Sequence, residues 1–470
     1  MAIDSDSKIP TVGFFPNTFP RDPVSINNFY EHVLIGQIIE PLVENTPSGE
    51  IAPCIASDWK ILNDGKTIEF GIRKGMLFSN GKSVTSEDVK YTLMRHKNGD
   101  SQSKSYLEKI ETIDTPAADK LVIHLSSPYV AIFKVLSRDH LGIVPAGWTF
   151  DPKSDRPFVG TGPYEVVRIK GDWLLTRNKY YRSPEQILTE RWKPIFYDIK
   201  NPAFNKQPNP DFIPYALSDV ANAVVSLKSK AGESVYKAQP INHFMQLSGW
   251  WYPHGNSYSN VEHRERSMSA VHSLLQRRRV KLDLRQATGV IPEGIAGYVP
   301  STPQPKMKKK ASEKTILTVR VAVVERELAA ITDAADIKAV ENEFGVRFVF
   351  TPVGLTEFSS LRASKPDVVV FVYAGGFHDP EGFLVVITAV LQSNLQTLFG
   401  SLYESYLAAS RETDWDKRTR LYQELNRKLT EAGMIAPGWK STVLSLTKKN
   451  ITQVSPAFSY TIKLINYSSK

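Results

Sequence analysis

Residues 365–380 read KPDVVVFVYAGGFHDP, and their centre, 368–373, is an unbroken apolar run. A short apolar run between turn-forming residues is typical of a strand that is buried on both faces of a sheet. The preceding part of the chain repeats this organisation: 317–324 predicts a strand, 325–342 the helix after it, and 346–350 a second strand. Strands and helices that alternate in this order predict an open α/β sheet.

The turn after the apolar run is a candidate ligand site, because ligands of open α/β sheets bind just beyond the carboxyl ends of the strands. Gly375 and Gly376 would let a ligand approach the backbone closely, and Tyr373 and Phe377 offer apolar walls. A plain turn also uses two glycines, so a purely structural role stays open. The adjacent pair His378-Asp379 suggests acid–base chemistry, although neighbouring residues rarely form such a couple.

A second candidate wall is the sequence LSGWWY at residues 247–252. Neighbouring side chains on a strand point to opposite faces of the sheet, so consecutive aromatic residues cannot all enter one core. We therefore expect at least one of Trp250, Trp251 and Tyr252 to face a cleft or an interface.

The first third of the chain predicts a small α+β lobe at about 39–154. Asn63-Asp64-Gly65 separates two strand-like runs and predicts a tight hairpin, because glycine accepts a positive φ. Thr85 and Asp88 form the pattern of a capping box, which predicts a helix from about Ser86 to Met94. Alternating apolar residues at 121, 123 and 125 indicate a further strand.

The last part of the chain predicts a long helix and closing strands. Asp414 is the expected N-cap of a helix in which Leu421, Leu425 and Leu429 recur every four residues, and Gly433 is its expected stop. Strands are expected at 442–446 and 461–465. Residues 183–240 lie between the first and the last parts of the chain and are broken by Asn-Pro and Pro-Asn-Pro turns. Within this stretch only 221–227 indicates a helix.

Length and charge limit the function classes. The 470 residues predict about three structural units, and 58 basic against 49 acidic residues give a net charge of +9. This charge permits attraction to nucleic acid or to an anionic membrane, but a scattered basic surface is favoured. The densest basic runs are 276–281, expected at an exposed helix end, and 306–310, expected in a solvated loop.

The sequence lacks the patterns of the common catalytic sites. Cys54 is its only cysteine, so neither an intrachain disulfide nor a cysteine-based zinc site is expected. The GKS and GKT triplets at 81–83 and 65–67 lack the spacing and context of a phosphate loop, and no serine-hydrolase elbow or His-Glu-x-x-His motif occurs. We therefore expect a protein that is not an enzyme and that holds no metal and no cofactor. No run of eighteen apolar residues occurs, and the first residues do not resemble a signal peptide, although a mature exported protein would look the same.

Several segments follow one another in an order that is familiar. They are Ile39-Glu40-Pro41-Leu42, Ser57-Asp58-Trp59, Asp64-Gly65-Lys66-Thr67-Ile68-Glu69-Phe70, Ile72-Arg73-Lys74-Gly75, Phe78-Ser79-Asn80-Gly81-Lys82, Thr85-Ser86-Glu87-Asp88-Val89, Gly160-Thr161-Gly162-Pro163-Tyr164, Arg177-Asn178, Thr413-Asp414, Lys417-Arg418, Leu421-Tyr422 and Leu425-Asn426. The sequence resembles the peptide/nickel-type extracellular solute-binding proteins of ABC importers, family 5. The resemblance covers about 10–182 and 315–465, and it is weak across the divergent stretch 183–315.

The resemblance implies an α/β fold of the periplasmic-binding-protein type (type II-like), a two-lobe clamp with an additional inserted α+β subdomain. Lobe I would be discontinuous, with a first segment at 1–38, a second at 155–236 and a return at 440–470. The hairpin-rich subdomain would be inserted at 39–154, and lobe II, the α/β ligand-clamping domain, would span 237–439. The lobes would close on the ligand by hinge motion.

The resemblance also implies positions for ligand contacts. Peptide-binding relatives place an acidic residue three positions before an Asp-Pro pair, where it holds the α-amino group of the ligand; here Asp379-Pro380 is present but that position is Gly376. Arg326 is the local candidate for a contact to a ligand carboxylate, with a helix-surface arginine as the alternative. Trp250 and Trp251 fall where relatives run a strand along the ligand, and Asn17 falls where relatives line the cleft.

The function implied is that of an exported receptor, periplasmic or at the cell surface, whose leader is not present in this sequence. It would capture a peptide or peptide-like small molecule and deliver it to an ABC permease, as a monomer and without binding nucleic acid. The missing amine anchor makes an N-blocked peptide, an oligosaccharide or a metal chelate alternative ligands. An intracellular ligand-sensing regulator that reuses the same clamp is an alternative of another class.

Overall fold

The chain forms two compact units. The computed structural model describes residues 9–14, 21–26, 29–46, 50–187, 189–196, 210–217, 236–252, 260–301, 316–354, 361, 365–374, 379–390, 395–448, 451–453 and 468–469. Unit 1 comprises Met1–Asn242 and Thr442–Lys470, and unit 2 comprises His243–Ser441. The two boundaries lie inside strands β12 (Tyr236–Trp251) and β16 (Ile435–Lys448), so both strands run from one unit into the other.

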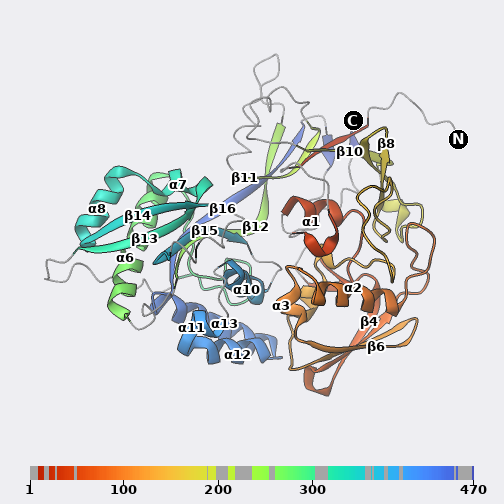
Figure 1. The fold of residues 1–470 in the computed structure, drawn as a ribbon, viewed down its shortest axis with the longest axis horizontal. Coiled ribbons are helices and arrows are strands. Elements are labelled where there is room, and N and C mark those ends of the chain that lie inside the picture. Colours follow the sequence, from red (N-terminus) through yellow and green to blue (C-terminus); the bar gives the residue numbers. More distant parts are fainter. Residues whose placement is uncertain are drawn as a thin grey trace, which may run out of the picture. The chain divides into compact units, whose positions relative to one another are not determined.

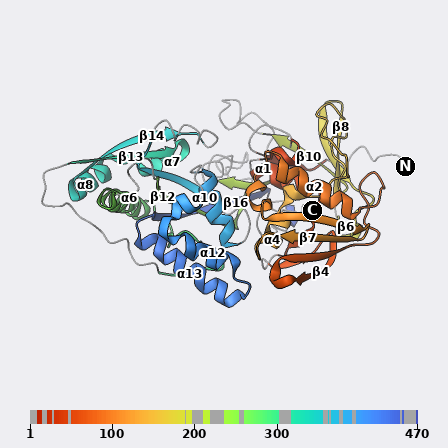
Figure 2. The same cartoon turned by 60° about the horizontal axis from the view of Figure 1, so that its bottom comes forward.

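Unit 2 is built on an α/β sheet with the strand order β14-β13-β15-β12-β16. Strand β13 (Leu317–Val324) pairs in parallel with β14 (Val346–Val353) and β15 (Val368–Ala374), and β15 pairs antiparallel with β12, with Trp250 opposite Val369. The predicted α/β class is confirmed, and β15 is the apolar run of the sequence analysis. The helices of this unit are α6 (Val261–Lys281), α7 (Glu325–Ile331), α8 (Ala334–Phe344), α10 (Pro380–Val390), α11 (Leu395–Phe399), α12 (Tyr403–Arg411) and α13 (Trp415–Glu431). Helices α11, α12 and α13 pack together beside α10 (Figures 1 and 2).

Unit 1 contains two larger groups of strands. In the first, β1 (Thr11–Phe14) pairs in parallel with β10 (Arg191–Phe196) and β11 (Phe212–Leu217), and the order continues through β9 (Asp172–Arg177) to β8 (Tyr164–Ile169). The second is a four-stranded antiparallel sheet in the order β4-β5-β7-β6, and helix α2 (Ser86–Asn98) contacts its strands β6 and β7 (Figure 2). Its strands are β4 (Ala56–Leu62), β5 (Thr67–Ile72), β7 (Lys120–Leu125) and β6 (Ile110–Ala117). The remaining elements are α1 (Phe29–Ile35), α3 (Lys104–Leu107), α4 (Ile132–Leu136), β2 (Val43–Asn45), β3 (Ile51–Pro53), β17 (Ile451–Gln453), β18 (Ser468–Ser469) and the short 3-10 turns η1 (Pro23–Ser25), η2 (Asn63–Gly65), η3 (Asp139–Leu141), η4 (Pro184–Gln186) and η8 (Gly400–Leu402).

The local predictions with a capping or turn signal are confirmed. The predicted hairpin is β4-η2-β5, in which Asp64 and Gly65 both have positive φ. Helix α2 begins behind a Thr85/Asp88 capping box, as expected, and ends at Asn98 rather than Met94. Helix α13 begins behind Asp414, whose side chain accepts a hydrogen bond from the Lys417 amide, and it ends two residues before Gly433.

The predicted single helix over 325–342 is wrong, because two helices occupy this stretch. Asp333 accepts hydrogen bonds from the amides of Ala335 and Asp336 at 3.1 and 3.0 Å and so caps a new helix, α8, after the end of α7. A side chain that satisfies the first free amides of a helix fixes its start at that residue. The predictions at 221–227, 306–310 and 461–465 lie outside the described residues.

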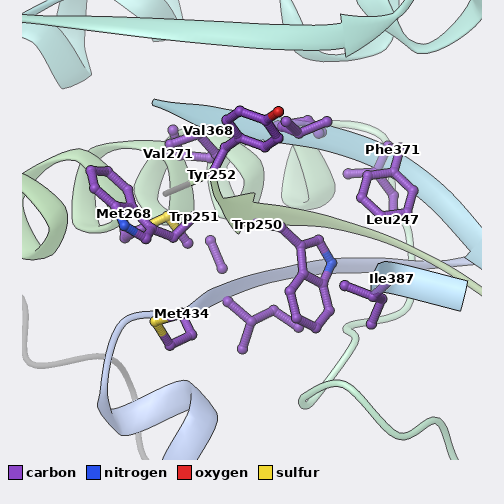
Figure 3. Packing of buried hydrophobic residues seen from close by; sticks show 14 of the residues in the cluster. Leu247, Trp250, Trp251, Tyr252, Met268, Val271, Val368, Phe371, Ile387 and Met434 are labelled. Carbon is purple, nitrogen blue, oxygen red and sulfur yellow. The ribbon is translucent and has the colours of Figure 1, made fainter. Parts of the chain in front are cut away.

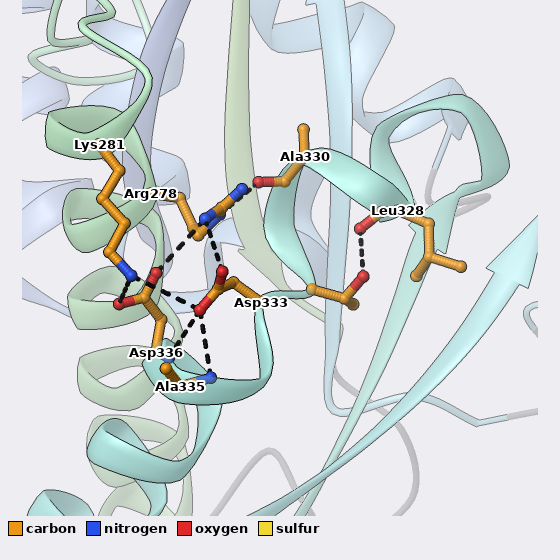
Figure 4. A network of polar contacts seen from close by, with 8 residues as sticks. Arg278, Lys281, Leu328, Ala330, Asp333, Ala335 and Asp336 are labelled. Carbon is orange, nitrogen blue, oxygen red and sulfur yellow. Dashed lines mark hydrogen bonds and ion pairs between the residues drawn. The ribbon is translucent and has the colours of Figure 1, made fainter.

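The basic run at 276–281 lies at the end of helix α6, as expected, with Arg277 and Lys281 exposed, but several of its cations are paired with acidic residues. Arg278 is largely buried, donates to the Ala330 carbonyl at 2.7 Å and lies 3.4 Å from both Asp333 and Asp336 (Figure 4). Lys281 contacts the same two aspartates, and Arg277 contacts Glu343 in α8. These ion pairs neutralise much of the densest described basic cluster and fasten α6 to α8.

The core of unit 2 is a single apolar cluster drawn entirely from its own residues. Figure 3 shows the side chains of Trp251 and Met268 together on the α6 side of β12, and Trp250 on the side of Ile387 in α10. The sheet is therefore covered by helices on both faces. Within the described part of the chain, no helix is long and apolar enough to cross a membrane.

Candidate functional site

The candidate turn after β15 is described at its two ends. Strand β15 ends at Ala374 and helix α10 begins at Pro380, while Gly375, Gly376, Phe377 and His378 lie outside the described residues. The side chains on either side of this stretch, Tyr373 and Asp379, are both buried in unit 2.

Tyr373 is part of a buried polar group at the end of β15. Its hydroxyl donates to the Val290 carbonyl at 2.9 Å, and it also contacts the side-chain amide of Gln246 on the neighbouring strand β12. The Gln246 amide donates in addition to the carbonyls of Gly289 and Val290, at 2.6 and 2.8 Å. Burial raises the pKa of Tyr373 well above its usual value, so the phenol is neutral. Its hydroxyl thus fixes the 289–290 backbone, and with 2% of its surface exposed the ring is not the open apolar wall that was predicted.

Asp379 is held by a buried ion pair with Arg418 in helix α13. Two hydrogen bonds of 2.8 and 2.9 Å join the guanidinium to the two carboxylate oxygens, and both side chains are 1% exposed. Asp379 also accepts a hydrogen bond from the Glu381 amide, which caps the start of α10. Burial opposes the charge of Arg418, but the neighbouring Asp379 raises its pKa well above the usual value, so the pair stays ionised.

A second buried carboxylate, Glu381, lies beside this pair. It accepts hydrogen bonds from the hydroxyls of Tyr406 in α12, at 2.8 Å, and of Tyr422 in α13. Burial raises the pKa of Glu381, and the negative charge of Asp379 adds to the effect, although Tyr422 and Arg418 work against it. The Arg418 guanidinium also lies 4.8 Å from the centre of the Tyr422 ring. The network fastens the beginning of α10 to α12 and α13.

Trp250 and Trp251 do not face open space. Their exposed fractions are 0% and 1%, and Tyr252 is 7% exposed, so the expectation that one of the three faces a cleft or interface is not met. The Trp250 ring meets Tyr373 edge-on at 5.9 Å, and Trp251 meets His263 of α6 at 5.7 Å. The strand prediction was correct in pointing the two rings to opposite faces, but helices cover both faces, so both rings lie in the core.

The other predicted contact residues are not brought together by the described structure. Arg326 is the second residue of α7, and its side chain is outside the described set, as is all of Asn17. Trp250 and Tyr373 touch one another, while Asp379 belongs to the separate network around Arg418.

The sequence analysis missed Arg418, Glu381 and Gln246. The position of Arg418 carried a usable signal, because it lies four residues before Tyr422 and seven before Leu425, on the apolar face of α13. A charged residue on a buried helix face requires a partner of opposite charge, and Asp379 is that partner. Gln246 and Glu381 carried no comparable signal.

The described residues offer no catalytic metal centre. No group of three or more His, Cys, Asp and Glu side chains is arranged to hold a metal ion in the part of the chain that the structure describes. The side chains of Tyr373, Asp379 and Glu381 instead form hydrogen bonds with neighbouring side chains and backbone. Gln246 Oε1, Trp250 Nε1 and Arg418 Nε have no hydrogen-bond partner among the described residues.

Comparison with protein families gives a match over residues 50–249, to the model described as bacterial extracellular solute-binding proteins, family 5 Middle. That group consists of substrate-binding proteins rather than enzymes. Among curated proteins, a transcriptional regulator, SgrR of Photorhabdus laumondii, is 29% identical over 164 residues, which is 35% of this chain and 28% of the regulator. The glutathione-binding protein GsiB of Salmonella choleraesuis is 23% identical over 310 residues, which is 62% of this chain and 58% of GsiB. The matched regions are therefore less than two thirds of the length of either relative.

Among solved structures, NikA from Brucella suis in complex with Fe(III)-EDTA superimposes with a TM-score of 0.76 and 17% identity. The superposition covers 98% of this chain and 100% of that chain. At this level of identity the likeness concerns the fold, and it extends over 98% of the chain.

Proposed function

We propose that this chain is the solute receptor of an ABC importer. It is a family 5 solute-binding protein by the match of residues 50–249 and by its fold. It captures a peptide or peptide-like small molecule in a cleft between two lobes and delivers it to a membrane permease. The observation that carries the proposal is the fold match over 98% of the chain, together with the family match in its first half. Ligand contacts that are better made in the closed state would drive closure.

The proposed ligand contacts are Asn17, Arg326 and the turn Gly375-Gly376-Phe377-His378. Tyr373 and Asp379 flank this turn as its buried framework, whereas Trp250 and Trp251 lie opposite Val369 and Val368 at the other end of β15. None of these four side chains touches the ligand itself, since all are almost fully covered in unit 2. No residue is assigned a catalytic role. We place the protein in the periplasm or at the cell surface, as a monomer with the permease as its macromolecular partner.

The ligand class follows from Gly376. In peptide-binding relatives an acidic residue at this position holds the free α-amino group, and glycine offers no such charge. A ligand without a free amine is therefore favoured: an N-blocked peptide, or failing that an oligosaccharide or a metal chelate. Glutathione and a chelate are what the names of GsiB and of the NikA complex give for those two proteins.

Isothermal titration against matched ligands tests the proposal. The panel contains free and N-acetylated dipeptides and tripeptides, murein fragments, oligosaccharides and metal chelates, after native mass spectrometry has identified any ligand that is retained on purification. Binding of N-acetylated peptides in preference to their free forms is the expected result. Absence of binding to every member of the panel, by protein free of retained ligand, would count against the receptor.

A gain of function tests the amine argument directly. The substitution Gly376→Asp introduces the missing carboxylate, and we expect the ratio of Kd values, N-acetylated to free dipeptide, to rise about tenfold, which corresponds to about 1.4 kcal/mol. Gly375→Asp is the matched control, because it adds the same charge one residue out of register. An equal change in both variants would show that the effect is one of general charge.

A second candidate function is a ligand-sensing transcriptional regulator, because several curated matches are SgrR proteins. The matches cover 23–28% of those regulators, and the basic run at 276–281 is largely paired with acidic residues. Fluorescence anisotropy with duplex DNA separates the two functions. A regulator requires specific DNA binding, and the logarithm of its association constant should fall linearly with the logarithm of the salt concentration. A solute receptor should show no specific DNA binding.

A further inference from the structure

Three histidines meet in the interior of unit 1. His32 lies in α1, His96 in α2 and His140 in η3, and their exposed fractions are 6%, 0% and 0%. The His32 and His140 rings are 4.7 Å apart and the His96 and His140 rings 5.5 Å apart, with both pairs edge-to-face. The cluster therefore joins α1 to the layer of α2 and η3. Gly36, just after α1, is part of the same contact, since a Cβ there would lie 3.2 Å from the Asp139 carboxyl carbon.

The hydrogen bonds require His32 to be neutral. The Gln102 side-chain amide donates to the Ile26 carbonyl at 2.5 Å, and its oxygen accepts from Arg138 at 3.4 Å, so the orientation of the amide is fixed. Its nitrogen lies 3.4 Å from His32 Nε2, which must be the acceptor because an amide nitrogen only donates. Protonation of that imidazole nitrogen would set two donors against each other.

His96 and His140 are each held by one serine. His96 Nδ1 lies 2.8 Å from Ser101 Oγ, and His140 Nε2 lies 2.9 Å from Ser103 Oγ. The other nitrogen of His140, Nδ1, has no hydrogen-bond partner among the described residues. A charged imidazolium donates from both nitrogens, so protonation of His140 would leave a buried donor unsatisfied.

The surrounding charges do not compensate a proton on these rings. The charged residues on the elements that carry or precede the three histidines include the cations Arg21, Arg95 and Arg138 and the anions Asp22, Glu31 and Asp139. Arg95 pairs with Asp22 at 2.6 Å, and Arg21 lies 3.5 Å from Glu31. Burial is the main cause that lowers the pKa of His32 and of His96 to about 3 and that of His140 well below its usual value, and Arg138 lowers all three further.

We propose that His32, His96 and His140 form a pH-sensitive joint that holds α1 against α2 and η3 while the rings are neutral and opens when they become protonated. In the open state, each ring that reaches water regains a pKa near 6.5. The joint is therefore closed above about pH 6.5. It is progressively weakened as the pH falls from about 6.5 towards the lowered pKa values that the histidines have in the closed state. The proposal does not depend on the ligand or on the permease.

Hydrogen exchange of the full chain at pH 7.4 and pH 5.0, corrected for the intrinsic rates, tests the joint. The opening equilibrium of α1 and η3 should rise about 30-fold at pH 5.0 for each histidine that is exposed on opening. The β4-β5 hairpin in the same unit contains none of the three histidines and serves as the internal reference.

The variant for this test is the double substitution His96→Asn and His140→Gln, which places an amide near each ring nitrogen that meets a serine and removes two titrating groups. In this variant, the ratio of the α1 opening equilibrium constant at pH 5.0 to that at pH 7.4 should be at least 30-fold lower than in the unaltered protein. His124→Gln is the control, because His124 lies in β7 of the same unit with its side chain 37% exposed. An unchanged ratio in the double variant, or an equal change in the control, would overturn the proposal.

A measurement on the unaltered protein guards against a variant that does not fold. Imidazole resonances followed by NMR should show three of the nine histidines keeping their neutral chemical shifts down to pH 5 in the closed molecules. If all nine titrate between pH 6 and 7 without a loss of α1 protection, the joint does not exist.

Discussion

The Asp379–Arg418 pair illustrates how one residue can carry a large share of the local energetics. Two ionised groups with 1% of their side chains exposed are costly to bury, and they persist because two hydrogen bonds join them. Removal of one partner strands the other charge in the core. Glu381 lies next to the pair and cannot replace Asp379, because its oxygens already accept from Tyr406 and Tyr422.

We predict that Arg418→Met lowers the free energy of unfolding by about 3–5 kcal/mol in urea denaturation, because it leaves Asp379 buried and unpaired. Adding Asp379→Leu should restore much of this loss, since no unpaired charge then remains. Lys428→Met is the control: its pair with Glu424 is exposed on α13, and the expected loss is below about 0.5 kcal/mol. A double variant that is less stable than Arg418→Met alone would contradict the interpretation.

The residues also show where sequence reasoning stops. Alternation on a strand predicts that at least one of Trp250, Trp251 and Tyr252 faces a cleft or an interface, and the alternation itself is observed for the two tryptophans. Whether a strand face meets solvent or a helix depends on elements distant in the sequence, here α6 and α10. Tyr373 was likewise placed correctly on its strand but its hydrogen bond to Val290 could not be inferred, because no local pattern connects residues 290 and 373.

At the level of elements, prediction succeeded where a local signal fixes an end. The capping box placed the start of α2, the Asp-Gly turn placed the β4-β5 hairpin, and Asp414 placed the start of α13. It failed at 325–342, where the apolar spacing continues across Asp333 and only the cap divides α7 from α8. The contacts of Asp333 and Asp336 with Arg278 and Lys281 of α6 were not visible to periodicity.

Asp88 is the strongest cap for an element-scale prediction. Its carboxylate accepts from the Thr85 amide and hydroxyl at 2.7 and 2.8 Å and from the Ala146 amide at 2.7 Å, so it joins the start of α2 to a distant loop. Asp88→Ala should therefore lower the free energy of unfolding by about 2 kcal/mol, measured by urea denaturation.

The matched control is Glu87→Ala, which removes an acidic side chain from the same helical turn. Glu87 accepts only from the exposed Thr115 hydroxyl among the bonds described, so the expected loss is below about 0.5 kcal/mol. Equal losses would mean that the favourable charge at the helix N-terminus, rather than the cap, provides the stability.

At the level of the whole molecule, the division into units has a consequence that can be measured. The apolar cluster of unit 2 is drawn only from residues between Leu247 and Trp439, and its sheet begins with β12 and ends with β16, which are neighbours in the strand order. The Trp251 amide donates to the Met434 carbonyl at 3.1 Å, so the two ends of this segment are joined inside the unit. A continuous segment with its own core meets the physical requirement for independent folding.

We therefore predict that residues 243–441 fold alone and unfold in urea in one cooperative transition, with native-like near-UV dichroism from Trp250, Trp251 and Trp439. A fragment of residues 260–441 is the control, because it lacks Leu247, Trp250 and Trp251 and leaves one edge of β15 without its partner strand. This fragment should lose the cooperative transition. If 243–441 instead binds a hydrophobic dye and shows no near-UV signal, its core needs support from the rest of the chain. Unit 1 has a different status, because its strand β11 pairs with residues 443–447 of β16, which follow unit 2 in the sequence. Its large sheet forms only when segments on both sides of unit 2 in the sequence come together, whereas unit 2 is one continuous segment, so unit 2 should fold first when the protein is refolded from urea.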